Sequence, residues 1–354
     1  MSQKHQHYVG MDGFRGIAAI LVAVIHISQE SKIPTSVNNF PMAVDFFFML
    51  SGYVIALSYE RKIADGQLDL AGFIKLRLMR LYPMIFFAAV LGITWRMVEG
   101  RFSVGSIAIS GVAALLLLPV ARFSGGHSTN SYPINGPSWS LTHEMIANIV
   151  FAAFAGFFRN GRVLAVVTAL VSLIEIIVGV RLGRLDFSTA WADQGYAVLR
   201  AMAPFLVGAL IYRSSRIWKP VVSNGVPLAG ALVLALVLFA PFENVFYSIA
   251  CIYLIFPAII FAGMVQPKSA WLITVFAVLG EISYPLYAVN QPLARWLNYF
   301  AGRYATINPQ VYIVVALALV TAIAFGISRL YDIPVRAMLR RKLASPRMAQ
   351  TNGL

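Results

Sequence analysis

Eleven long apolar runs constrain the fold of this 354-residue chain more than any other feature. They lie near residues 11–29, 40–58, 81–98, 104–121, 138–158, 162–180, 197–212, 225–241, 244–264, 272–299 and 309–330. Because a helix needs about 20 apolar residues to cross a bilayer, runs of this length predict transmembrane helices. The runs do not alternate between apolar and polar residues as the strands of a membrane β-barrel do. We therefore predict an all-α fold: a polytopic integral membrane protein with about ten transmembrane helices and one re-entrant or broken segment.

The distribution of Lys and Arg predicts the orientation. Basic residues gather in loop 60–80, turn 159–162, loop 213–219 and the C-terminus, and the positive-inside rule places such clusters in the cytoplasm. Eleven full crossings cannot bring all four to one side. We therefore expect ten crossings, both termini inside, and one incomplete segment between residues 81 and 158. The Pro- and Gly-rich stretch 124–140 is a candidate re-entrant backbone, since such backbone must be buried or line a wet cavity.

No linker separates a second domain, so we expect one transmembrane domain over 1–335 and a basic cytoplasmic tail over 336–354. The net charge of +14 is ascribed to cytoplasmic loops and to contacts with anionic lipid or phosphate; no nucleic-acid partner is predicted. The single cysteine, Cys251, excludes an intrachain disulfide. We find no metal-ligand spacing, P-loop, Rossmann fingerprint or nucleophile elbow.

Ionisable residues inside apolar runs are costly and are functional candidates by default. They are Asp12, Arg15, His26, Asp45, His143, Glu144, Glu175 and Glu281. Arg15 and His26 are eleven residues apart, which places them on one helix face, roughly 16 Å apart along the axis. Histidine is the side chain best suited to proton transfer near neutral pH. A helix–helix hydrogen bond is the alternative for His26.

Asp45 shares a helix face with Gly52, and glycine allows helix backbones to approach closely. A buried aspartate needs a partner, and we expect His26 or Arg15 on the preceding helix. Asp45 would then orient the histidine or form a structural pair with the arginine.

Arg77 and Arg80 are spaced i, i+3 on one helical face at the predicted cytoplasmic surface. Two forked guanidiniums in this arrangement suit a polyphosphate ligand, with simple membrane anchoring as the alternative. Ser140 and Glu144 share a face just after a Pro/Gly break. Residues 280–292 are also unusually polar for an intramembrane run.

In this order, the motifs resemble those of the bacterial acyltransferase 3 family of membrane-bound O-acyltransferases. The likeness extends from residue 8 to about 335 and is carried by the ordered set Asp12-Gly-x-Arg15-Gly to His26, Asp45-Phe-Phe-Phe to Ser51-Gly52, Arg77-x-x-Arg80, Trp139-Ser140-Leu141 to Glu144, and Gly280-x-Ile282-Ser283-Tyr284-x-x-Tyr287. One departure is Asn290, where many members have histidine, which leaves the accessory role of that histidine open here. The chain carries no hydrolase-like extra domain, so we expect a single-module enzyme.

The resemblance implies transfer of an acyl group, often acetyl from acetyl-CoA, to a hydroxyl of a cell-envelope carbohydrate or glycolipid such as O-antigen or exopolysaccharide. It implies a location in the bacterial inner membrane. His26 is the expected general base, and Asp45 or Glu144 is expected to hold its tautomer. Arg15, Arg77 and Arg80 are expected to bind the coenzyme A phosphates. The expected contacts to substrate or oxyanion are Ser51, Tyr53, Trp139, Ser140, Glu281, Ser283 and Tyr284. The oxyanion donors are expected to be backbone groups or Trp139 and Tyr284.

A transporter or flippase for a glycolipid or small polar solute is the alternative function, because a broken helix and polar intramembrane residues fit it equally. A purely structural subunit is disfavoured by the number of buried ionisable groups. The sequence leaves open the acceptor, the acyl chain length, direct transfer against an acyl-enzyme intermediate, and the oligomeric state.

Overall fold

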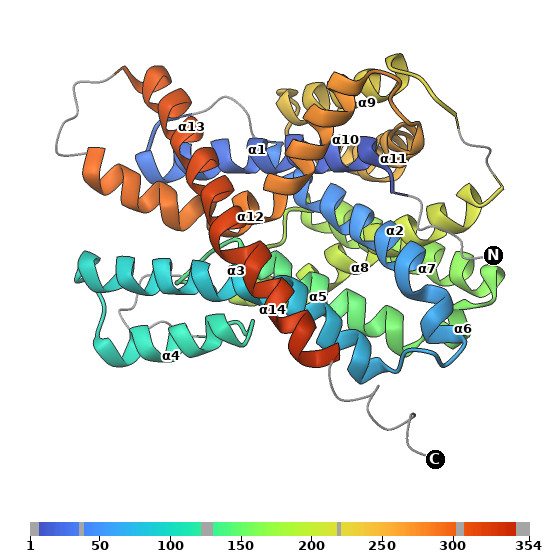
Figure 1. Ribbon diagram of the computed structural model, residues 1–354, viewed down its shortest axis with the longest axis horizontal. Coiled ribbons are helices and arrows are strands. Elements are labelled where there is room, and N and C mark those ends of the chain that lie inside the picture. Colours follow the sequence, from blue (N-terminus) through green and yellow to red (C-terminus); the bar gives the residue numbers. More distant parts are fainter. Residues whose placement is uncertain (1–6, 35–38, 122–129, 218–220, 302–307, 345–354) are drawn as a thin grey trace.

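The computed structural model describes residues 7–34, 39–121, 130–217, 221–301 and 308–344, and no β-strand occurs within these ranges. The helices pack into one bundle (Figure 1). Residues 124–129 of the Pro- and Gly-rich stretch and the polar tail from 345 lie outside the described ranges. The predicted all-α fold is confirmed.

The helices closely follow the apolar runs. They are α1 (Val9–Ser31), α2 (Ala43–Ala64), α3 (Leu70–Glu99), α4 (Val104–Leu115), α5 (Ser138–Ala153), α6 (Ala155–Phe158), α7 (Gly161–Leu182), α8 (Gln194–Ser215), α9 (Gly225–Phe239), α10 (Val245–Ala250), α11 (Phe256–Met264), α12 (Ala270–Ala301), α13 (Pro309–Ile327) and α14 (Ile333–Ala344). Short π-helical segments, Cys251–Ile255 and Ser328–Asp332, join α10 to α11 and α13 to α14. Residues 336–344 of the predicted tail therefore belong to α14.

Eight helical segments in the described ranges are long and apolar enough to cross a membrane, which confirms a polytopic membrane protein. The helix α4 has only 12 residues, about 18 Å at 1.5 Å per residue, against a hydrocarbon core of about 30 Å. This supports α4 as the incomplete segment expected between residues 81 and 158. The helices α5 and α9 are also short, with 16 and 15 residues, so the number of ten crossings stays a prediction.

Two pairs of helices form the closest contacts of the bundle. The helix α1 packs along α12 (Figure 1); a Cβ added at Gly16 would lie 2.4 Å from the Leu279 side chain. The helix α2 packs on α8 in the same manner, because a Cβ at Gly52 would lie 1.8 Å from the Phe205 carbonyl oxygen. Glycine at these positions lets the backbones approach.

The non-helical backbone before α5 is buried, as expected for a re-entrant segment. Residues 131–143 are all buried. The Pro133 carbonyl accepts hydrogen bonds from Arg96, and the Ile134 carbonyl accepts one from Arg295 at 3.2 Å. These arginines replace the water that such carbonyls would otherwise need. The segment is thereby fixed where α5 begins.

Three of the predicted cytoplasmic basic clusters lie at one end of the bundle. Arg213, near the end of α8, forms an ion pair with Glu60 of α2 and donates hydrogen bonds to the carbonyls of Phe158 and Arg159. Arg159 also pairs with Asp65 at 3.5 Å. The ends of α2, α6 and α8 therefore meet, in agreement with the positive-inside prediction.

Candidate functional site

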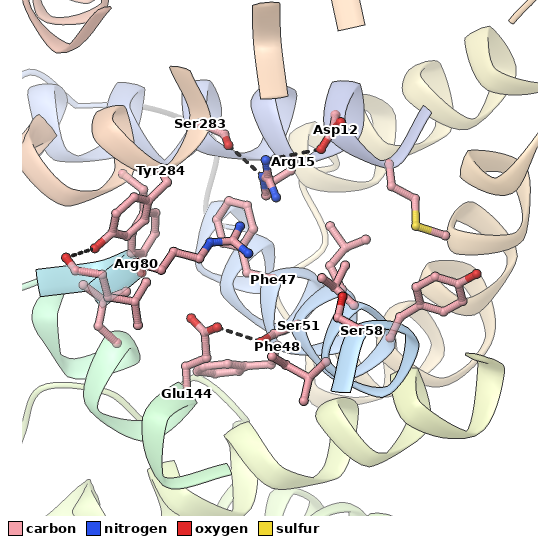
Figure 2. Close-up of a pocket in the computed structure, with 18 of the residues that line it drawn as sticks. Asp12, Arg15, Phe47, Phe48, Ser51, Ser58, Arg80, Glu144, Ser283 and Tyr284 are labelled. Atoms are coloured by element: carbon pink, nitrogen blue, oxygen red, sulfur yellow. Dashed lines mark hydrogen bonds and ion pairs between the residues drawn. The ribbon is translucent and has the colours of Figure 1, made fainter. Parts of the chain in front are cut away.

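A cavity of about 430 Å³ opens between α1, α2, α3, α5 and α12. Its wall is largely apolar, with a small group of charged side chains at one place, which is typical of a ligand site. Figure 2 shows Arg15 from α1, Arg80 from α3 and Glu144 from α5 pointing toward one another across it. The sequence predicted all three as site residues, and the fold brings them together.

Arg15 is held against α12 by its own hydrogen bonds. Its Nε donates to Ser283 Oγ at 2.8 Å, and its Nη2 donates to the Gly280 carbonyl at 3.0 Å. Asp12, one turn earlier, pairs with Arg15 at 3.3 Å. Because α1 lies so close to α12, the guanidinium reaches the cavity from a fixed position (Figure 2).

Arg77 is the most buried of the cavity arginines, with a side chain only 4% exposed. It pairs with Glu144 Oε1 at 2.9 Å, and the Ser51 hydroxyl donates to the same oxygen at 2.6 Å. Within the described residues, Arg77 Nε has no hydrogen-bond partner. A buried donor without a partner is costly, but this nitrogen has no contact with the cavity space, so only the rest of the guanidinium can meet a ligand there.

Arg80 lines the same cavity and forms no hydrogen bond or ion pair within the described ranges. The three cavity arginines outnumber the two carboxylates, Asp12 and Glu144. The cavity thus carries excess positive charge next to apolar walls, which suits a phosphate ligand attached to an apolar or weakly polar arm.

His26 is half-buried and is not among the residues that line the cavity. Its Nδ1 lies 2.6 Å from Oδ1 of Asn290, whose Nδ2 donates to the Tyr287 carbonyl at 3.0 Å. Because Oδ1 can only accept, Nδ1 carries the proton and Nε2 is left as a base. The expectation that Asp45 or Glu144 holds this tautomer is wrong: the amide of Asn290 does. Arg15 and His26 both face α12, as their spacing predicts.

Asp45 pairs neither with His26 nor with Arg15, which corrects the sequence-based expectation. It forms a bidentate pair with Arg200 of α8 at 2.7 and 2.9 Å. Both side chains are almost fully buried, and the Arg200 guanidinium also lies 5.1 Å from the Trp139 ring centroid. The face shared by Asp45 and Gly52 is therefore the contact with α8. Arg200 lies inside the apolar run 197–212 and could have been found by the same intramembrane-charge criterion.

The other predicted site residues divide between the cavity and its surroundings. Ser51, Tyr53, Ser140, Ser283 and Tyr284 line the cavity. The Tyr284 hydroxyl donates to the Leu81 carbonyl at 2.5 Å, so in this conformation it is not directed at an oxyanion.

Trp139 and Glu281 lie elsewhere. Trp139 packs against Phe48 and Arg200, and Glu281 pairs with Arg329 of the π-helical segment at 2.7 Å. Neither is among the lining residues. The expected oxyanion role of Trp139 and substrate contact of Glu281 thus have no geometric support. Tyr287, which closes the Gly280–Tyr287 motif and had no predicted role, does line the cavity.

The described residues hold no group of three His, Cys, Asp or Glu side chains that could bind a metal ion. What the fold and the cavity define is a multi-helix membrane protein with a partly apolar, arginine-lined ligand site.

Comparison with known proteins then assigns the chain to a family. The family profile described as an acyltransferase domain matches residues 8–329, so the chain belongs to the acyltransferase 3 family and is a membrane-bound acyltransferase. Protein 2 in the picA locus of Rhizobium radiobacter is 31% identical over 160 residues, which cover 42% of this chain and 82% of that protein. O-acetyltransferase OatA of Staphylococcus aureus is 24% identical over 358 aligned positions, which cover 92% of this chain but only 57% of that protein. No solved structure matches the chain significantly.

Proposed function

We propose that this protein transfers an acyl group, most simply acetyl, from acyl-coenzyme A to a hydroxyl of a cell-envelope carbohydrate or glycolipid. The observation that carries the proposal is Arg80, a cavity-lining cation without a partner in the described ranges, with the Arg15 and Arg77 guanidiniums in the same wall. These groups suit the phosphates of coenzyme A, and the apolar walls suit its pantetheine arm and acyl group. The named activity of the staphylococcal relative supports O-acyl transfer.

His26 is the proposed general base. Its Nε2 takes the proton of the acceptor hydroxyl while the hydroxyl oxygen attacks the thioester carbonyl. The carbon–sulfur bond then breaks, and the coenzyme A thiolate leaves with the electron pair and is protonated. Asn290 holds the required tautomer through Nδ1. In this proposal Glu144 positions Arg77 and Ser51, and Asp45 stabilises the α2–α8 contact through Arg200.

The same proposal orients the protein in the bacterial inner membrane with both termini in the cytoplasm, where coenzyme A is found. The arginine-rich cavity would then open near the cytoplasmic face, and the acceptor would reach His26 from the opposite side. The basic residues that meet around Arg213 support this orientation.

The test uses full-length protein in lipid nanodiscs, radiolabelled acetyl-CoA and envelope glycan. We expect Arg80→Ala to raise the KM for acetyl-CoA about 10- to 100-fold, the value of a charge-assisted contact, with little change in kcat. His26→Ala should abolish transfer at normal protein levels. Arg61→Ala, which removes an exposed charge outside the cavity, is the matched control and should leave KM unchanged. Unchanged KM in Arg80→Ala, full activity in His26→Ala, or glycan flux without acyl transfer would contradict the proposal.

A further inference from the structure

Tyr287 lies between the arginine-lined cavity and His26. Its side chain lines the cavity, whereas its backbone carbonyl accepts the hydrogen bond from Asn290, the partner of His26. His26 itself is not a lining residue. Tyr287 is therefore the cavity-lining residue that is joined, through Asn290, to the His26 imidazole.

Contacts from two other helices hold the Tyr287 ring in this position. Its hydroxyl lies 2.5 Å from Ser140 Oγ on α5. Because the Ser140 hydroxyl donates its one hydrogen to the Pro137 carbonyl at 3.0 Å, Tyr287 is the donor in this bond. The ring also meets Phe47 of α2 edge to face, with centroids 5.3 Å apart. Three helices thus converge on a tyrosine that is only 7% exposed.

The segment of α12 that carries Tyr287 is bounded by two prolines, Pro285 and Pro292. Each removes one backbone hydrogen bond, and helices bend most readily at such positions. The carbonyl left free by Pro292, that of Ala288, accepts a hydrogen bond from Asn135 at 3.0 Å. The helix ladder around Tyr287 therefore lacks two backbone hydrogen bonds, one of which is replaced by the contact from Asn135.

We propose that Tyr287, with Ser140 and Phe47, forms a gate that separates the acyl donor from His26 and from water until an acceptor is bound. This inference rests on the proposed function and deepens it, since the gate determines whether the acyl group reaches an acceptor hydroxyl or water. Loss of the Tyr287–Ser140 hydrogen bond opens the gate. The hydrogen bond from Asn290 to the Tyr287 carbonyl couples the same movement to the orientation of the His26 imidazole. Tyr287 is thus a positioning residue.

The first experiment measures release of coenzyme A from acetyl-CoA with and without acceptor in nanodiscs. We expect Tyr287→Phe and Ser140→Ala, which delete one hydrogen bond from opposite ends, to raise the ratio of hydrolysis to transfer by the same factor, about five-fold. Tyr287→Ala should raise it further. In Tyr287→Phe and Ser140→Ala, which leave the three arginines in place, the KM for acetyl-CoA should change far less than in Arg80→Ala, which separates this result from failure of the arginine site. Tyr82→Phe, at an exposed tyrosine outside the cavity, is the control. If Tyr287→Phe, Ser140→Ala and Tyr287→Ala all leave the ratio of hydrolysis to transfer unchanged, the gate is overturned.

The second experiment does not depend on activity. A His26→Cys variant in a Cys251→Ala background carries a single thiol, which a charged thiol reagent can modify from the side of the arginines in proteoliposomes. We expect labelling about five-fold faster with Tyr287→Phe, and faster again with Tyr287→Ala. Equal labelling rates with and without Tyr287 would contradict the gate even if acyl transfer were never observed. If labelling is faster in the Tyr287 variants but the protein with His26 intact transfers no acyl group, the gate is retained and the proposed function is refuted.

Discussion

The neighbour of His26 is an amide, and this determines how the imidazole can act. Asn290 presents an oxygen to Nδ1 and donates through its own nitrogen to the Tyr287 carbonyl. The two hydrogen bonds fix the direction of the amide, because the reversed amide would place two acceptors against each other. A neutral partner therefore sets the tautomer without adding a charge inside the bundle.

Asn290→Ala should lower kcat about 10- to 100-fold, a fraction of the full contribution of a general base, because Nδ1 loses its acceptor. Asn290→Asp keeps an acceptor and should retain more activity. Steady-state kinetics with saturating acetyl-CoA measures both. Neither variant should change the KM for the donor, since Asn290 does not line the cavity. Equal kcat in Asn290→Ala and the wild type would show that the amide does not position the base.

The buried ion pair between Asp45 and Arg200 is expected to stabilise the folded protein. Asp45→Asn should lower the stability by about 3 kcal/mol or more, because it leaves a buried guanidinium without its counter-charge. Thermal unfolding in detergent, followed with a thiol-reactive dye, reports this directly, since Cys251 is buried in the folded chain. The double variant Asp45→Leu, Arg200→Met should recover part of the loss. A melting temperature unaffected by Asp45→Asn would contradict the structural assignment.

At the scale of elements, the contact between α2 and α8 positions the cavity wall that carries Ser51. Gly52 of α2 faces the Phe205 carbonyl, and Gly208 of α8 faces the Met49 carbonyl. An added methyl group would meet rigid backbone in both cases. The glycines thus set the helix separation at which Asp45 reaches Arg200.

Gly208→Ala should destabilise the protein strongly, by about 2 kcal/mol or more, because its Cβ would lie 1.9 Å from the Met49 carbonyl oxygen. Gly195→Ala on the same helix has no atom within 4 Å of the new Cβ and should be neutral or slightly stabilising, given the higher helix propensity of alanine. Detergent melting curves of the two variants give the comparison. Equal melting temperatures would mean that the helices can move apart without cost.

At the scale of the whole molecule, three of the basic clusters gather at one end of the bundle. The basic residues around Arg213 lie at one end. The connections after α7 and before α5 meet at another place, where the Ser131 backbone nitrogen donates to the Thr189 carbonyl at 2.7 Å. The exposed Asp186 lies in the same connection as Thr189.

Topology labelling tests the orientation. In a Cys251→Ala background, cysteines at Asn160 and Arg216 should be inaccessible to an impermeant thiol reagent added from the periplasm, because the positive-inside rule places both in the cytoplasm. A cysteine at Asp186 should be labelled and is the control for reagent access. Labelling at 160 or 216 from the periplasm would contradict ten crossings with both termini inside.

The pattern of apolar residues was enough to predict the helical membrane fold, since a bilayer leaves helices as the main way to satisfy the backbone of a continuously apolar run. Spacing along one helix was equally informative: Arg15 with His26, Arg77 with Arg80, and Ser140 with Glu144 behave as helical periodicity requires. The sequence alone thus determined the fold class, the helix faces and the set of polar candidates.

Contacts between helices were decided only by the tertiary structure. The pairing of Asp45 with Arg200, the choice of Asn290 as the partner of His26, and the place of Tyr287 between cavity and imidazole all join residues more than 100 positions apart or set them across helix interfaces. Periodicity states which face a residue occupies, whereas side-chain packing determines which helix that face meets.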